Sequence, residues 1–519
     1  MNKERPKIAF LGAGSARWTS RILIDIWLTP GLRNAEIWLM DIDDYRLRII
    51  GRFANRYVEE LKVPGRVFVT RDRKEAIRDA DFVISTVLAK GYTYYEKMRA
   101  ISEDYGYRYG INAVEWNYVG DYHTIWGYYQ FKTHLEIARD IEELAPDAWF
   151  FIVANPVLEL TTLIGRETKV KVAGICHGFL GFVKVLEVLG MRLAREKLGK
   201  NITPLCAMHD PNCIKTIAGI VDVNELELEM QGFNHVIWLT KFRYGGENAY
   251  RYVDDWLKED AEEYWTVWRE YTSNPWDVEL APAAFDMYKT YGYLPIGDSV
   301  RGGTWKYHWD LRTKQYWYGP YGGPDSEFGN AFRVLLVRRT IEEMARTVFD
   351  DSAPLVQKIP PRPSGELLAP LMDAIYNNKP ADSYLLGVAG ASTETPMYVG
   401  ALNIGGAYLK APMYVNILNN GTLDSLPNNI AVEVPVYADG KGIHAKPVSH
   451  TPPKIYKYVL LHRLLRAEWA LQAFTEGGKD ALIQWLAIDV RTKSMQQVND
   501  VIDALLKMPE NEEMAKHFR

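Results

Sequence analysis

The segment that most limits the fold of this chain is KIAFLGAGSARWTSRILIDIW, residues 7–27. Lys7–Leu11 is a short apolar run rich in residues that favour strands, which predicts a buried strand. A turn with two glycines, Gly12 and Gly14, follows directly, and apolar residues then recur at helical spacing up to Pro30. A strand, a glycine turn and a helix in this order form the usual binding site for a pyrophosphate, which the N–H groups at the start of the helix attract.

A second predicted strand, residues 35–40, ends at Asp41. A carboxylate in this position accepts hydrogen bonds from a ribose and repels a 2′-phosphate, which favours NAD over NADP. The predicted cofactor-binding residues are Gly12, Gly14, Ser15, Asp41 and Thr86. Position 17, where the full fingerprint has a third glycine or alanine, is arginine, so a tight turn in another kind of α/β protein stays open as an alternative.

Strands and helices alternate along the first part of the chain. Further strands are predicted over residues 66–70, 81–86, 149–154 and 170–175. This alternation predicts an α/β fold, an N-terminal Rossmann-like doubly wound parallel sheet. The second part is more mixed and predicts a C-terminal α+β domain, with strands at 232–239, 411–418 and 430–436. We expect a dinucleotide-binding domain over residues 1–200 and a substrate-binding and oligomerisation domain over residues 201–519.

Composition excludes several classes of protein. The net charge of −5 provides no basic surface for nucleic acid. The sequence contains no apolar segment long enough to span a membrane and no apolar region of a signal peptide near its start, so we expect a cytoplasmic protein. Three cysteines in 519 residues do not form a disulfide framework. Cys206 and Cys213 lie in an irregular segment with His209 and Asp210; two unpaired thiols are expected there, rather than a disulfide or a secondary metal site.

Aromatic residues are concentrated in two groups, one between residues 256 and 271 and one between residues 305 and 318. Such residues suit the binding of sugar rings, but they are equally typical of an interface between domains or subunits. The sequence does not decide between these two interpretations.

Several polar side chains stand at the ends of predicted strands, where a parallel sheet binds its ligands. Cys176 and His235 each follow or begin such a strand, and a thiolate with an imidazole suits a divalent first-row transition metal. Each residue by itself is more typical of a packed or hydrogen-bonded side chain. Asn155 can present its amide to a ligand or form an Asx turn, and Asp121 can bind a ligand or cap a helix.

The order of several motifs resembles that of glycoside hydrolase family 4. These motifs are KIAFLGAGS, LMDID, ANP, CHG, NHVIWL, PIGDSVR and NNGTLDSLPNNIAVEVP, followed by ENEEMAKHF near the end of the chain. The Cys-His-Gly form resembles members that act on unphosphorylated α-glucosides or α-glucuronides, and the surrounding sequence looks most similar to α-glucosidases.

The resemblance implies hydrolysis by redox-assisted elimination, an exception to the two-carboxylate mechanism of most glycosidases. NAD oxidises C3 of the sugar, a base removes the acidified proton at C2, and a divalent metal stabilises the enediolate. The C1 aglycone then leaves with proton assistance, water adds, and the steps reverse, which regenerates NAD. NAD and Mn2+, or another divalent transition metal, are the implied cofactors, and an α-glycoside is the implied substrate. The resemblance also fits a homodimer or homotetramer.

Residue roles follow from the same resemblance. Cys176 and His235 match the metal ligands, His177 the proton donor to the leaving group, and Asp298 the proton acceptor; Asp121, Asn155 and Arg301 match substrate-binding positions. Tyr288 or Tyr291 is the alternative base, because phospho-β-glycosidases use a tyrosine. The alternatives to an α-glucosidase are an α-glucuronidase of the same family, an NAD-dependent hydroxy-acid dehydrogenase and a non-catalytic sugar sensor.

Overall fold

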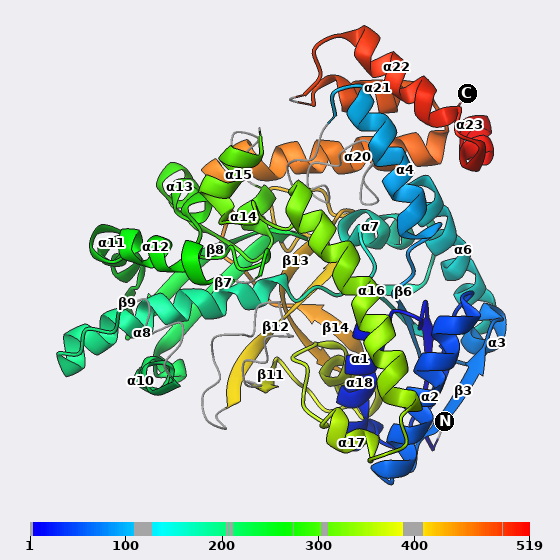
Figure 1. Ribbon diagram of the computed structural model, residues 1–519, viewed down its shortest axis with the longest axis horizontal. Coiled ribbons are helices and arrows are strands. Elements are labelled where there is room, and N and C mark those ends of the chain that lie inside the picture. The colour runs from blue at the N-terminus through cyan, green and yellow to red at the C-terminus, as the bar shows by residue number, and fades with distance from the viewer. Residues whose placement is uncertain are drawn as a thin grey trace.

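The computed structural model describes residues 4–107, 127–203, 206, 211–272, 274–302, 310–387, 408–489 and 491–518. One mixed sheet runs through this part of the chain, in the order β10-β8-β7-β13-β12-β6-β5-β4-β1-β2-β3. Figure 1 shows the N-terminal elements at the lower right, α8 and α11 to α13 at the left, and α20 to α23 across the top. No helix in the described ranges is both long and apolar enough to cross a membrane.

The N-terminal half of the sheet is parallel and has the order β3-β2-β1-β4-β5-β6. This confirms the predicted Rossmann-like sheet, and every predicted strand lies within two residues of its expected ends. The strands are β1 (Lys7–Leu11), β2 (Glu36–Met40), β3 (Arg66–Thr70), β4 (Phe82–Ser85), β5 (Trp149–Ile152) and β6 (Lys171–Gly174). The helices of this half are α1 (Ala16–Leu28), α2 (Asp44–Glu60), α3 (Arg73–Ile77), α4 (Gly91–Asp104), α6 (Tyr128–Leu144), α7 (Val157–Glu167) and α8 (Phe182–Leu198).

The other half of the sheet is antiparallel and joins the parallel half through a single bridge, Asn416 of β12 to Gly174 of β6. Its strands are β7 (Leu226–Phe233), β8 (Val236–Tyr244), β9 (Glu247–Asn248), β10 (Leu294–Ile296), β11 (Ser383–Gly387), β12 (Tyr408–Leu418), β13 (Ala431–Asp439) and β14 (Gly442–Ala445). Because the sheet is continuous, the domain boundary at residue 200 stays a prediction.

The helices of the second half pack partly on these strands and partly on helices of the N-terminal half, such as α2 and α4. They are α10 (Pro211–Ile220), α11 (Tyr250–Glu259), α12 (Ala261–Tyr271), α13 (Pro282–Tyr291), α14 (Ser299–Gly302), α15 (Leu311–Tyr318), α16 (Glu327–Phe349), α17 (Leu355–Lys358), α18 (Leu368–Tyr376), α19 (Pro453–Ile455), α20 (Leu461–Glu476), α21 (Lys479–Ala487), α22 (Met495–Leu506) and α23 (Glu512–His517). Short helical segments cover Pro30–Leu32, Gly178–Gly181, Val223–Glu225, Tyr456–Leu460 and Pro509–Asn511. Side chains of α20 to α23 form a separate apolar cluster with α4 and α6.

The prediction of one strand over residues 232–239 is wrong. Asn234 and His235 form the turn of a β-hairpin between β7 and β8. His235 has a φ of 59°, in the left-handed region that β-strands do not use. The run FNHVIWL looks continuous because its turn lacks the Asn-Gly or Asp-Gly pair that usually marks a two-residue hairpin.

The expectation of two unpaired thiols is also wrong. Cys206 and Cys213 form a disulfide, with 5.8 Å between their Cα atoms, a normal separation for such a bond. The segment is less irregular than expected because α10 begins at Pro211. His209 and Asp210, the two other polar residues of this segment, lie outside the described residues.

The first aromatic group belongs to the core. Trp256, Tyr264, Trp265 and Trp268 are buried among the side chains around α11 to α13, whereas Tyr271 is half exposed. In the second group, residues 305–309 lie outside the described ranges. The first group therefore provides packing area, and its side chains do not line the cavity described below.

Candidate active site

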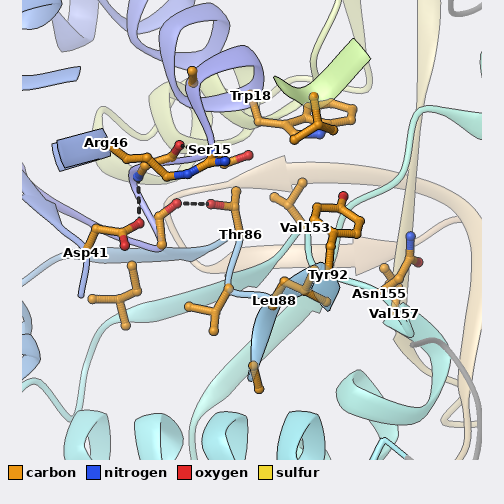
Figure 2. A pocket seen from close by; sticks show the side chains of 18 of the residues that line it. Ser15, Trp18, Asp41, Arg46, Thr86, Leu88, Tyr92, Val153, Asn155 and Val157 are labelled. Carbon is orange, nitrogen blue, oxygen red and sulfur yellow. Dashed lines mark hydrogen bonds between the residues drawn. The ribbon is translucent and has the colours of Figure 1, made fainter. Parts of the chain in front are cut away.

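A cavity of about 920 Å³ opens at the carboxyl ends of the parallel strands. Its walls come from the loops after β1, β2, β4, β5 and β6, together with the N-terminal half of α16. In Figure 2, Ser15, Asp41, Arg46 and Thr86 gather at one end, and Tyr92, Asn155 and Val157 lie toward the other. This is where an open parallel sheet places its ligands.

The glycine turn forms one end of the cavity. Gly12 has a φ of +80°, and a Cβ atom on it would lie 2.9 Å from the backbone nitrogen of Val87, so only glycine fits. The Thr86 hydroxyl donates a hydrogen bond of 2.8 Å to the Gly12 carbonyl. The Asp41 carboxylate accepts a hydrogen bond of 2.7 Å from the Gly14 N–H. Ser15 caps α1 without a side-chain hydrogen bond, which leaves N–H groups of the helix start for a ligand.

A group of three potential metal ligands lies in the wall of the same cavity. The ligand atoms of Cys176, His235 and Asp298 all lie within 4.8 Å of one another. His235 Nε2 is 3.1 Å from Asp298 Oδ2. A thiol, an imidazole and a carboxylate together suit a first-row divalent ion, so the donor set fits the metal that the sequence implied.

The loops that carry these ligands come unusually close to one another. A Cβ atom on Gly297, whose φ is +58°, would lie 2.0 Å from the carbonyl oxygen of Gly178. The Ser299 hydroxyl oxygen accepts a hydrogen bond of 2.7 Å from the Ile237 N–H of β8, which fixes the Asp298 loop to the hairpin. The close backbone contact thus brings Cys176 and Asp298 together.

Burial changes the titration of both predicted ligands. It raises the pKa of the Cys176 thiol well above its usual value, and the nearby carboxylates of Glu433 and Asp298 raise this pKa further. Burial lowers the pKa of His235, so its imidazole is neutral at pH 7. Neutral imidazole is the form that binds metal, and a bound divalent ion would itself favour the thiolate.

His177 lies next to the candidate metal group and is held from two sides. Its ring stacks on Trp18, with 5.1 Å between the ring centroids, and its Nδ1 is 3.3 Å from Glu366 Oε1. Burial alone would lower the pKa of His177, but the carboxylates of Glu366 and Asp298 outweigh it, so the net pKa is raised. A protonated imidazole in this position can donate a proton to a leaving group.

Arg301 links the candidate metal group to a second buried carboxylate. Its guanidinium donates to Asp298 and also to Asp325. Asp325 in turn accepts a hydrogen bond of 3.3 Å from Arg333 of α16. All four side chains are at least 85 % buried and line the cavity.

The remaining predicted residues have different outcomes. Asn155 lines the cavity, and its buried Oδ1 has no hydrogen-bond partner among the described residues. Asp121 lies outside the described residues. Neither Tyr288 nor Tyr291 is among the described residues that line the cavity; the Tyr288 hydroxyl donates to Asp254 instead.

Sequence reasoning missed Trp18, Glu366, Asp325 and Arg333. Of these four residues, Trp18 could have been found from the sequence, because it follows Gly14 of the glycine turn by four residues. The other three come from residues 325–366, far from the motifs in the sequence, and only the fold brings them to the cavity.

The fold and cavity define an α/β protein with a Rossmann-like parallel sheet and a candidate metal centre, and comparison with known proteins identifies its family. Residues 7–191 match the model of the family 4 glycosyl hydrolases, and residues 230–388 and 408–492 match the C-terminal domain of the same family. The chain therefore belongs to glycosyl hydrolase family 4.

Individual relatives differ in their substrates. An α-glucosidase of Erwinia rhapontici is 24% identical over 513 residues, which cover 96% of this chain and 97% of that protein. An α-galactosidase of Rhizobium meliloti is 32% identical over 190 residues, 36% of this chain. The matches to this α-galactosidase and to another from Bacillus subtilis span only 38% and 51% of those proteins.

Solved structures share the fold over nearly the whole chain. The putative glucosidase lplD from Bacillus subtilis has a TM-score of 0.70 at 18% identity and covers 97% of this chain and 100% of its own. A 6-phospho-α-glucosidase from gut microorganisms, solved in complex with NAD and Mn2+, has a TM-score of 0.62 at 16% identity, with 98% and 99% covered.

Proposed function

We propose that this glycosidase hydrolyses neutral α-glucosides with the help of NAD and a divalent metal such as Mn2+. The observation that carries the proposal is the convergence of Cys176, His235 and Asp298 within 4.8 Å in the wall of a cavity that also contains the glycine turn. A 6-phospho-α-glucosidase of the same fold was solved with both NAD and Mn2+, which supports this choice of cofactors.

The chain provides a place for each cofactor. Gly12, Gly14 and Ser15 would hold the pyrophosphate of NAD, and Asp41 and Thr86 lie beside them. Cys176 and His235 would hold the metal. When bound, NAD supplies reversible oxidation at C3 of the sugar, and the metal supplies Lewis-acid stabilisation of the sugar oxygens.

The protein's own side chains would move the protons. His177, kept protonated by Glu366, would donate its proton to the departing oxygen at C1. Asp298 would accept the proton from C2, because its carboxylate lies in the candidate metal group and is held in place by Arg301. Asn155, whose buried Oδ1 has no partner in the described structure, and Arg301 would bind the sugar, as would Asp121.

The charges beside the candidate metal group support a neutral sugar. Arg301 and Arg333 are both paired with carboxylates, those of Asp298 and Asp325. An anionic C6 group would need a cation to offset the cost of its burial. The long match to an α-glucosidase points in the same direction, and an α-glucuronidase is the alternative.

A panel of nitrophenyl glycosides tests the proposal. The enzyme is stripped of cofactors and assayed with NAD, Mn2+ and a thiol reductant, each also omitted in turn. We expect the α-glucoside to be cleaved faster than the α-glucuronide and the α-galactoside, with an absolute need for NAD and no net NADH. Stoichiometric NADH with a free hydroxy acid would instead indicate the dehydrogenase, and sugar binding without turnover would indicate a sensor.

The oligomeric state is part of the same proposal. We infer a homodimer or homotetramer, which light scattering after size-exclusion chromatography tests directly. Exposed apolar side chains on α16, namely Phe328, Leu335 and Phe349, support an interface on this helix, since exposed apolar groups in one region favour association.

A further inference from the structure

We propose that Glu433 is a positioning residue of the candidate metal centre, where its buried negative charge favours a divalent ion that other residues bind. Glu433 lies on β13 and is 1% exposed. Its carboxylate accepts hydrogen bonds from the side-chain amides of Asn234, at 3.0 Å, and of Asn416, at 3.3 Å. This inference rests on the proposed function only in taking Cys176 and His235 as ligands of a divalent ion.

The sheet places Glu433 between the two strands that lead to these ligands. Glu433 lies opposite Gly232 of β7 on one side and opposite Asn416 of β12 on the other. Asn416 in turn lies opposite Gly174 of β6, in the single bridge between the two halves of the sheet. Each of these two glycines precedes a predicted metal ligand by two or three residues. The row of paired residues therefore sets Glu433 between the backbones that carry the two ligands.

Asn234 connects Glu433 to both ligands. It precedes His235 in the hairpin turn, and its amide donates to the Glu433 carboxylate. The same side chain forms a hydrogen bond with Cys176 that lowers the pKa of the thiol. Glu433 raises this pKa more than Asp298 does, as expected for a carboxylate close to the sulfur. One amide thus holds the turn with the imidazole, the thiol and the buried carboxylate together.

Glu433 has no cationic partner among the described residues. Both of its hydrogen bonds come from neutral amides, and its second oxygen, Oε1, has no hydrogen-bond partner in the described structure. A buried carboxylate without a cation is costly. A divalent ion would supply the missing positive charge, because it adds net positive charge even after the Cys176 thiol has lost its proton. Glu433 should therefore stabilise the metal-loaded site and destabilise the empty one.

Replacement of Glu433 by glutamine separates these two effects. Glutamine keeps the length of the side chain and one accepting oxygen, but it removes the charge. Its new N–H groups can donate to the Oδ1 atoms of Asn234 and Asn416, which are buried without a hydrogen-bond partner in the described part of the chain. We expect Mn2+ to bind about 10- to 100-fold more weakly, whereas the metal-free variant should melt no lower than the metal-free wild type.

Two measurements on metal-stripped enzyme in the presence of NAD test this expectation. Titration with Mn2+, followed by electron paramagnetic resonance of the free ion, gives the affinity, and thermal unfolding without metal gives the stability. Glu229→Gln is the matched control. Within the described ranges, the Glu229 carboxylate on β7 also accepts hydrogen bonds only from uncharged donors, but Glu229 is not among the described residues that line the cavity. Its Mn2+ affinity should stay within threefold of the wild-type value.

Two results would overturn the inference. An Mn2+ affinity within threefold of wild type in folded Glu433→Gln would mean that the charge does not act on the metal centre. A metal-free variant that melts well below the wild type would indicate a purely structural role. If Glu433→Gln does not fold, Asn234→Ala decides: it removes the amide that contacts both Glu433 and Cys176, so Mn2+ must bind about tenfold more weakly, and an unchanged affinity refutes the inference.

Failure of the proposed function looks different. In that case the wild type itself binds no Mn2+ or cleaves no α-glucoside. Failure of this inference alone leaves both properties of the wild type intact and appears only in the variants.

Discussion

Replacement of Glu366 by glutamine tests how the protein prepares its proton donor. The Glu366 carboxylate lies 3.3 Å from His177 Nδ1, and the two side chains are only 8% and 16% exposed. A hydrogen bond to a charged group contributes about 1.5–3 kcal/mol. If this energy stabilises the protonated imidazole before it donates its proton, its loss reduces the protonated fraction of His177. At a pH above the His177 pKa the rate then falls by up to about 10- to 150-fold.

How far the rate falls in Glu366→Gln depends on the leaving group of the substrate. Methyl α-glucoside and maltose lose an alcohol, which needs a proton from His177, so their kcat should fall by the full factor. A nitrophenyl glucoside loses a stabilised phenolate, which needs no proton, so its kcat should change much less. A general defect in folding or sugar binding would slow all three substrates equally.

The pH profile gives the sign of the effect. Glu366 raises the pKa of His177, so its removal lowers that pKa and reduces the protonated fraction at neutral pH. The alkaline limb of kcat/KM for methyl α-glucoside should therefore move to lower pH in Glu366→Gln. Glu468→Gln, which removes a remote carboxylate paired with Arg166, is the control. A wild-type profile, or a shift to higher pH, would refute the role given to Glu366.

Three other predictions test the rest of the structure. Gly12→Ala should weaken NAD binding at least tenfold in calorimetry, because its Cβ would collide with backbone at 2.9 Å; Gly199→Ala has a similar φ of +61° but no atom within 4 Å, and it should bind NAD normally. Reduction of the Cys206–Cys213 disulfide should destabilise the protein by about 2.5 kcal/mol, from the loop entropy of a seven-residue separation. Denatured, unreduced protein should contain one free thiol, and three would contradict the bridge. Asp298→Asn should abolish exchange of the C2 proton with solvent but retain Mn2+ affinity within tenfold, whereas a loss as large as that of a true ligand would make Asp298 the third ligand.

The parallel half of the fold was predictable because its signals are local. The short apolar run Lys7–Leu11 predicts a strand, and the glycine turn that follows it within a few residues supports this prediction. Asp41 follows the next strand at the expected place. Cys176 lies directly after such a strand and was found in the same way. These predictions needed no knowledge of distant contacts.

The rest of the site depends on contacts between distant parts of the chain. Glu366 reaches His177 across 189 positions in the sequence, and Asp325 reaches Arg301 from the start of α16. No spacing rule connects such residues, because the segments between them fold into several separate helices and strands. The disulfide was missed for a different reason: an apparently irregular segment contained α10, whose start places Cys213 within bonding distance of Cys206.

His235 was predicted as a site residue although the secondary structure predicted around it was wrong. Side chains alternate between the two faces of a strand, so a strand through residues 232–239 would fix the direction of His235 by its neighbours. The hairpin turn removes this constraint, and the φ of 59° turns the imidazole toward Asp298, 3.1 Å away. Asn234, the other turn residue, donates a hydrogen bond of 3.0 Å to the buried Glu433 of β13. This bond connects the turn to the sheet. The turn is therefore the element that presents the imidazole to the metal group, and its strained backbone is stabilised by a buried polar contact that the sequence pattern does not reveal.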